Sequence, residues 1–172
     1  GNAAGAPTFA AVSLTADVSG TLPVANGGTG VTAIPAFSVH KNGTNQTGIV
    51  SATFTIVSWS TELFDTNNNF ASNRFTPTVA GSYFLTATLL WLNALEDQKP
   101  YYCVLYKNGA RFKEARALGS GTAAMSISLN VVVAANGSTD YFEIYAVHEA
   151  VANMTVYGDS FMTHFSGMWV AP

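Results

Sequence analysis

The sequence predicts an all-β domain, and three observations carry this prediction. Aromatic and β-branched residues occur in short runs separated by turn residues, as they do in β-sandwiches and β-barrels. Residues 126–133 alternate strictly between apolar and polar side chains, which indicates a half-buried strand. The only helix candidate, residues 111–118, has no continuous apolar stripe at helical spacing. We therefore interpret residues 111–118 as an irregular edge strand.

The composition restricts size, partners and compartment. The chain has 172 residues, enough for one core, and only 10% of them are charged, well below the usual ~25%. A net charge of -3 favours neither nucleic acid nor anionic lipid as a partner. The longest uninterrupted apolar run, Val131 to Ala135, is too short to cross a bilayer, so no membrane insertion is expected. A single cysteine, Cys103, excludes an intrachain disulfide and suits assembly in a reducing cytoplasm.

The chain changes character near Ile34. Residues 1–33 are mostly small or polar and cannot build a core of their own, and the absence of an initial Met suggests a piece of a longer protein. Residues 34–172 are predicted to form the folded domain. Lys107-Asn108-Gly109 predicts a tight hairpin between two strands. The predicted strands are residues 53–59, 82–92, 101–106, 126–133, 141–148 and 161–170.

The strand at residues 83–92 is apolar on both of its faces. Tyr83 and Leu85 begin one face, whereas Phe84, Leu90 and Leu92 lie on the other. A sheet in a two-layer sandwich buries only its inner face within the domain. The outer face must therefore be covered by another chain or by a loop of the same chain. Together with the shortage of charge, this favours a homo-oligomer.

A run beginning at Trp59 resembles the signature of the complement C1q globular domain, a member of the C1q/tumour necrosis factor superfamily. The loop between the second and third aromatic positions is two residues shorter than in the family, and Leu85 replaces the final Phe. The hairpin at residues 105–109 and the closing Phe165-Ser166-Gly167 also resemble the family pattern. The matching positions of the signature are Trp59, Asp65, Phe70, Phe75, Gly81 and Tyr83.

This resemblance covers about Ala36 to Val170 and implies a jelly-roll β-sandwich that assembles as a homotrimer. It agrees with the separate inference from the two-faced strand. Some members of the family bind calcium, and residues 65–69 offer oxygen ligands, although turn formation explains the same residues. We assign the trimer contacts to Tyr83, Leu85, Tyr141, Phe165 and Trp169.

The leader at residues 17–30 resembles a segment that recurs in tail-fibre proteins of tailed bacteriophages, where it precedes a terminal knob. Leu22, Val24 and Val31 would meet near the axis of a trimeric stalk, and the glycines would allow close backbone approach. Residues 1–33 are thus predicted to be an extended junction between a fibre shaft and its head. The alternative is a flexible tether.

No catalytic, metal or cofactor site is predicted. His148-Glu149 lacks the second histidine of a zinc-protease motif, and His40 and His164 are distant in sequence from any acidic cluster. Neither a nucleophile elbow nor a Cys-His signature occurs. The ten acidic residues are spread along the chain and mark no particular pair of carboxylates for glycan hydrolysis. We therefore predict that the protein is not an enzyme.

Two sets of residues are candidates for receptor binding. Lys107, Arg111, Lys113 and Arg116 form a basic cluster, which would contact an anionic glycan or protect a strand edge from aggregation. The aromatic residues in or beside the loops at residues 93–100 and 151–159 would stack on sugars or lie at the trimer seam. These aromatic candidates are Trp91, Tyr101 and Tyr157.

The predicted function is attachment. A trimeric fibre head, assembled in the host cytoplasm and carried on the virion, would bind a glycan or protein receptor on the host cell and join other fibre or baseplate proteins. Three copies of a weak site would gain avidity for a repeated receptor. The alternatives are a capsid or tail decoration protein without a receptor, a cellular C1q-like lectin, and a small hydrolase.

Overall fold

The computed structural model describes Gly20, Leu22, Gly28, Val31 and residues 33–172. The leader that we interpret as a shaft junction lies almost entirely outside the described residues. Residues Ala33–Pro172 form one compact unit, built from two antiparallel sheets. The described residues contain strands and turns and no helix, so none of them forms a helix that would span a membrane.

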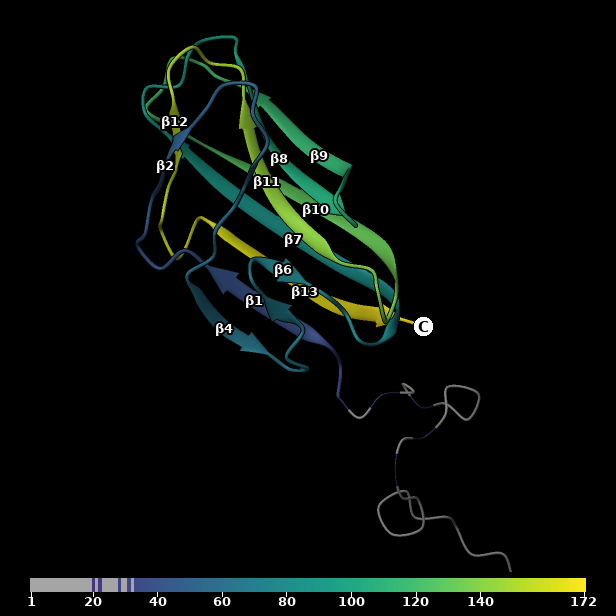
Figure 1. The fold of residues 1–172 in the computed structure, drawn as a ribbon. Helices are drawn as coiled ribbons and strands as arrows, with labels where there is room; N and C mark the ends of the chain where they lie inside the picture. The colour runs from purple at the N-terminus through teal and green to yellow at the C-terminus, as the bar shows by residue number, and fades with distance from the viewer. Residues whose placement is uncertain (1–19, 21, 23–27, 29–30, 32) are drawn as a thin grey trace, which may run out of the picture. The chain divides into compact units, whose positions relative to one another are not determined.

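Figure 1 shows the two sheets, with β8 and β11 lying over β7 and β10. We call the seven-stranded sheet sheet A and the six-stranded sheet sheet B. Sheet A contains β1 (Ala36–His40), β2 (Gln46–Ile49), β4 (Thr61–Asp65), β7 (Ala80–Leu92), β10 (Ala124–Asn136), β12 (Met154–Val156) and β13 (His164–Ala171). Sheet B contains β3 (Thr55–Ile56), β5 (Phe70–Ala71), β6 (Arg74–Phe75), β8 (Pro100–Lys107), β9 (Ala110–Leu118) and β11 (Phe142–His148).

Five of the six predicted strands, all but residues 53–59, are confirmed, with small differences at their ends. The predicted edge strand is β9, at one edge of sheet B. The predicted hairpin joins β8 to β9, and Asn108 and Gly109 have φ values of 55° and 77°, the left-handed pair that a tight hairpin turn requires. Sequence reasoning missed the short strands β1, β2, β4, β5, β6 and β12.

The predicted strand at residues 53–59 is mostly wrong, because only Thr55–Ile56 pairs with β11. The side chain of Gln46 takes the place of a neighbouring strand. Its Nε2 donates to the Ile56 carbonyl at 2.7 Å, and its Oε1 accepts from the Ser58 amide at 2.9 Å. The Trp59 amide in turn donates to the side chain of Asn73 at 2.8 Å. Side chains therefore satisfy backbone groups that a ladder would otherwise pair.

The core between the sheets is centred on Phe37 of β1. Its ring stacks on Phe75 at 4.2 Å between centroids and meets Phe165 edge-on at 4.9 Å. Gly167 faces this ring from β13, where an added Cβ would lie 2.6 Å from a Phe37 ring carbon. The Phe165-Ser166-Gly167 motif thus supplies one aromatic to the core and leaves room for another.

One lysine is buried without a carboxylate. Lys41, directly after β1, is fully buried, and its Nζ donates to the Ser58 carbonyl at 2.8 Å and to Ser58 Oγ at 3.1 Å. No acidic group pairs with it in the described part of the chain. Burial lowers the pKa of Lys41 from 10.5 to about 8, because the charged ammonium loses its hydration.

This burial predicts a pH-dependent stability. Between pH 8 and pH 10.5 the unfolded chain holds the Lys41 proton that the folded chain has released, so the free energy of unfolding should rise with pH. We expect Lys41→Met to remove roughly 2–3 kcal/mol of that rise. Urea denaturation of both proteins at several pH values measures the difference, and identical pH dependence in the two would contradict the prediction.

Candidate functional site

Sheet A has one face turned away from sheet B, and we call it the open face. Its most apolar row crosses three strands, because Phe84 of β7 pairs with Met168 of β13 on one side and with Val132 of β10 on the other. The exposed fractions of these side chains are 37%, 48% and 62%. Phe64 of β4 extends the same face and is 50% exposed. The residues of the open face are Ala36, Ser38, Phe64, Phe84, Thr86, Thr88, Ser128, Asn130, Val132, His164, Ser166 and Met168.

The polar groups of the open face bond to one another. Ser38 and Ser166 share a hydrogen bond of 2.8 Å between β1 and β13. Thr86 donates to Asn130 at 2.7 Å, and Thr88 and Ser128 share a bond of 2.8 Å, all between β7 and β10. The open-face residues include no Lys, Arg, Asp or Glu. The face can therefore lose water without burying an unpaired charge.

A shallow groove of about 300 Å³ runs through this face between β4, β1, β13 and β7. Phe64 and Phe84 contribute aromatic side chains to it, and Ser38 and Ser166 line it as well. A groove lined mainly by apolar atoms, on a face whose named residues include no Lys, Arg, Asp or Glu, is typical of a contact surface rather than of a solvated exterior.

The predicted trimer-contact residues do not lie on the open face. Tyr83, Leu85, Phe165 and Trp169 are at most 6% exposed and belong to the core. They point toward sheet B because they occupy the alternate positions of β7 and β13. These four side chains are not available to a second chain in this fold, because the domain's own core covers them. Tyr141 lies elsewhere, beneath the Arg74 guanidinium at 3.7 Å from its ring centroid.

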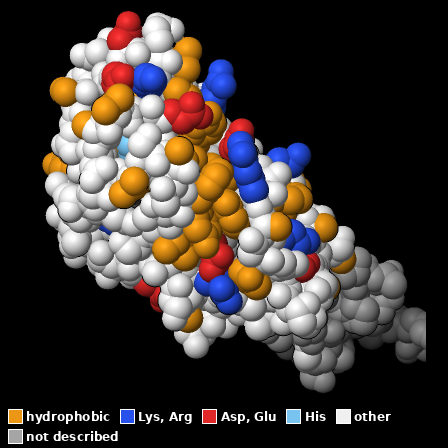
Figure 2. Space-filling view, turned by 45° about the horizontal axis from the view of Figure 1, so that its top comes forward, with side chains coloured by type: hydrophobic (Ala, Val, Ile, Leu, Met, Phe, Trp, Pro, Cys, Tyr) orange, Lys and Arg blue, Asp and Glu red, His pale blue; other side chains and the backbone are white. Residues whose placement is uncertain are grey.

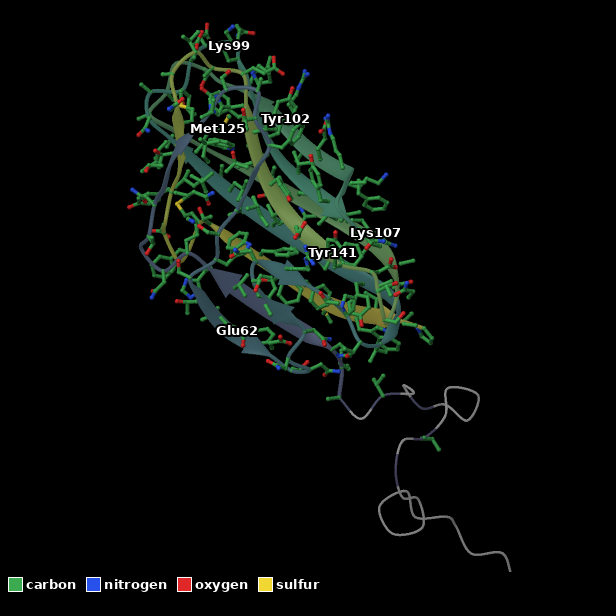
Figure 3. The ribbon with its side chains drawn as sticks, viewed as in Figure 1. Glu62, Lys99, Tyr102, Lys107, Met125 and Tyr141 are labelled. Carbon is green, nitrogen blue, oxygen red and sulfur yellow. The ribbon has the colours of Figure 1, made fainter. Side chains whose placement is uncertain are left out.

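The outer face of sheet B carries a second surface, which we call the aromatic band; its residues are Phe54, Tyr102, Tyr106, Tyr141 and Tyr145. Tyr106 of β8 and Tyr145 of β11 stack with ring centroids 4.1 Å apart, and Phe54 meets Tyr106 edge-on at 5.9 Å. Figure 2 shows hydrophobic side chains in a band along this side of the domain, flanked by Lys and Arg. Tyr102 and Tyr141, labelled in Figure 3, lie toward opposite ends of it.

Charged and polar groups border the aromatic band. The Tyr102 hydroxyl donates to Glu149 Oε1 at 3.0 Å, and the Arg116 side chain also lies close enough to influence it. Burial and the Glu149 carboxylate raise the pKa of Tyr102, so the hydroxyl keeps its proton at neutral pH. Arg111 lies over Phe54 at 5.5 Å and pairs with Glu114. A groove of about 200 Å³ opens here, lined by Ala52, Phe54, Tyr102, Arg111, Val147 and Glu149.

The predicted receptor-binding residues are dispersed. Trp91 and Tyr101 are fully buried and pack on His148, so they cannot contact a receptor in this fold. Tyr157 is half-buried after β12. Lys107 is held by Asp140 at 2.9 Å and by the Ala134 carbonyl at 2.8 Å. The three remaining basic residues, Arg111, Lys113 and Arg116, are exposed on β9.

The groups that invite a catalytic or metal interpretation have structural partners. His148 is fully buried, with Nε2 2.8 Å from the Ile49 carbonyl and Nδ1 accepting from the Ala150 amide at 3.2 Å, as in a neutral imidazole. Asp65 accepts from the amides of Asn67 and Phe70, which is turn chemistry. Within the described residues, no three His, Cys, Asp or Glu side chains are grouped to hold a metal ion.

Comparison with known proteins confirms the fold. No protein-family model matches the sequence, and no curated protein does either. Among solved structures, murine APRIL at pH 8.0 is 10% identical with a TM-score of 0.61, covering 80% of this chain and 100% of that one. Eiger TNF from S. frugiperda is 13% identical at 0.54, with 80% and 93% covered. The globular domain of zebrafish complement 1qA is 15% identical at 0.50, with 80% and 98% covered. The chain has the predicted C1q/TNF-like jelly-roll sandwich.

His164 is half-buried at the start of β13, beside His40 and Thr88. Its burial predicts that the folded chain loses stability in acid. Burial lowers the pKa of His164 below its ordinary 6.5, so the unfolded chain takes up this proton first as the pH falls. The free energy of unfolding should decrease below about pH 6.5. We expect His164→Gln to lose less stability between pH 7.5 and 5 than the unmodified chain. Equal losses in urea titrations would rule this out.

Proposed function

We propose that three copies of the chain associate through the open face to form the head of a bacteriophage fibre, which attaches the virion to a glycan receptor on the host cell. The observation that carries this proposal is the uncharged apolar row of Phe84, Val132 and Met168 on a face that no other part of the described chain covers. Such a face is costly to leave in water at about 25 cal/mol per Å². Covering it with further copies of the same chain removes this cost.

The fold and the composition support association of identical chains. The fold is one support, because we expect domains with a C1q/TNF-like sandwich to form trimers. The composition is the other, because only 10% of the residues are charged and can keep the surface solvated. The fibre context rests on the leader at residues 17–30, which lies almost wholly outside the described residues. In this proposal the protein acts by binding and performs no catalysis.

Attachment is tested with fluorescently labelled protein on a panel of candidate host bacteria, with the mass determined by light scattering on the same sample. Saturable binding to some strains by a particle about three times 18.1 kDa supports the proposal. If the protein is a trimer but binds no strain, the attachment function is rejected in favour of a decoration protein on the virion. A monomer would remove the basis for association through the open face.

A substitution in the apolar row tests the assembly. Phe84→Glu should dissociate the oligomer at micromolar concentration, because it buries three unpaired carboxylates where aromatic rings would pack. Light scattering measures the mass, and circular dichroism checks that the sandwich remains folded. Val151→Glu is the matched control, because Val151 is also an apolar residue at the surface, 83% exposed in the loop after β11, and its substitution should leave the mass unchanged. A folded Phe84→Glu protein of unchanged mass would refute this interface.

A further inference from the structure

We infer that the aromatic band is the receptor-contacting surface and that its ligand is a neutral pyranose residue of a glycan. The inference rests on the proposed attachment function, and it names both the site and the class of sugar. It replaces the buried Trp91 and Tyr101 with residues that solvent and a ligand can reach.

The apolar part of the band matches the C–H face of a sugar ring. Phe54 is 39% exposed and meets Tyr106 edge-on, and the half-buried rings of Tyr106 and Tyr145 stack on each other beside it. No hydrogen bond joins the Tyr106 or Tyr145 hydroxyl to another described residue, and neither oxygen is a buried orphan. Both hydroxyls are therefore free to bond a ligand that lies over the rings. Rings with polar tips are suited to ligands that are apolar on one side and polar on the other.

The polar end of the groove matches neighbouring hydroxyl groups. The Tyr102 phenol donates to the Glu149 carboxylate and lies opposite Arg116 in the pairing of β8 with β9, so an acceptor and a guanidinium donor both lie near it. A sugar hydroxyl both donates and accepts, so two adjacent hydroxyls can satisfy this pair at once.

The charge at the groove favours an uncharged sugar. Arg111 is already paired with Glu114, and Glu149 adds a second carboxylate to the lining. Beside Tyr102 the Arg116 guanidinium and the Glu149 carboxylate offset each other, so these groups leave no net positive charge to hold a sugar acid. A neutral hexose needs no such charge.

The position of the aromatic band keeps it available in an assembly. It lies on the outer face of sheet B, whereas the open face belongs to sheet A on the other side of the sandwich. Association through the open face therefore leaves the bands uncovered by that contact. Several weak sites on one rigid particle then act together on a repeated glycan.

The test is saturation-transfer NMR on the full chain with the methyl glycosides of glucose, galactose, mannose and glucuronic acid as probes. We expect transfer to at least one neutral glycoside, strongest at the C–H protons of one ring face, and less transfer to the glucuronide. Tyr102→Ala should weaken binding about tenfold, since it removes a stacking ring and a hydroxyl. Glu149→Gln keeps the shape and should weaken binding several-fold.

Phe161→Ala is the control variant, because Phe161 is an aromatic residue 87% exposed in the loop before β13, away from the band, and its loss should change nothing. No transfer to any neutral glycoside, or transfer that survives both band substitutions, would overturn the inference. If the chain binds cells while these glycosides show no transfer, attachment stands and this site fails. If the glycosides bind at the band and no cells are bound, the site stands and attachment fails.

Discussion

The packing of one phenylalanine organises this sandwich. Phe37 touches aromatic rings from both sheets, and its ring fits only because residue 167 on the neighbouring strand has no side chain. This contact fixes which side of β1 and β13 is inside, and strand alternation then assigns every other residue of those strands to the core or to the open face. A larger residue at position 167 would therefore disturb both the core and the surface beyond it.

The sequence was informative where alternation is clear and ambiguous where both faces of a strand are apolar. Residues 126–133 alternate strictly, and β10 has the expected inner and outer sides. In β7, Tyr83 and Phe84 begin two apolar faces, and the pattern does not say which one is turned toward sheet B. The structure resolves this, because Tyr83 is fully buried and donates its hydroxyl to the Val79 carbonyl at 2.8 Å. The contact residues predicted from the sequence are therefore mostly core residues.

The aromatic band could not be found from the sequence for a different reason. Its members come from three separate parts of the chain, and only the register of β8 with β11 and the path of the segment before β3 bring them together. Tyr102 and Tyr106 of β8 and Tyr145 of β11 alternate along their strands with residues that fill the core, so they lie on the outer face of sheet B. The signal was present as tyrosines four residues apart, at 102 and 106 and at 141 and 145, but polar-tipped rings on a predicted strand are compatible with either side of a sheet.

The pairing of β1 with β13 also determines when this domain can fold during synthesis. The strand that begins the sandwich is completed by the strand that closes it, and all of the intervening sheet must be made first. A nascent chain therefore emerges with the rings of Phe37 and Phe75 unprotected until β13 has left the ribosome. Such long-range closure is slow and exposes apolar surface on the way. We expect this domain to fold only after β13 has been synthesised, and its yield to depend on whether the newly made chain avoids aggregation until then.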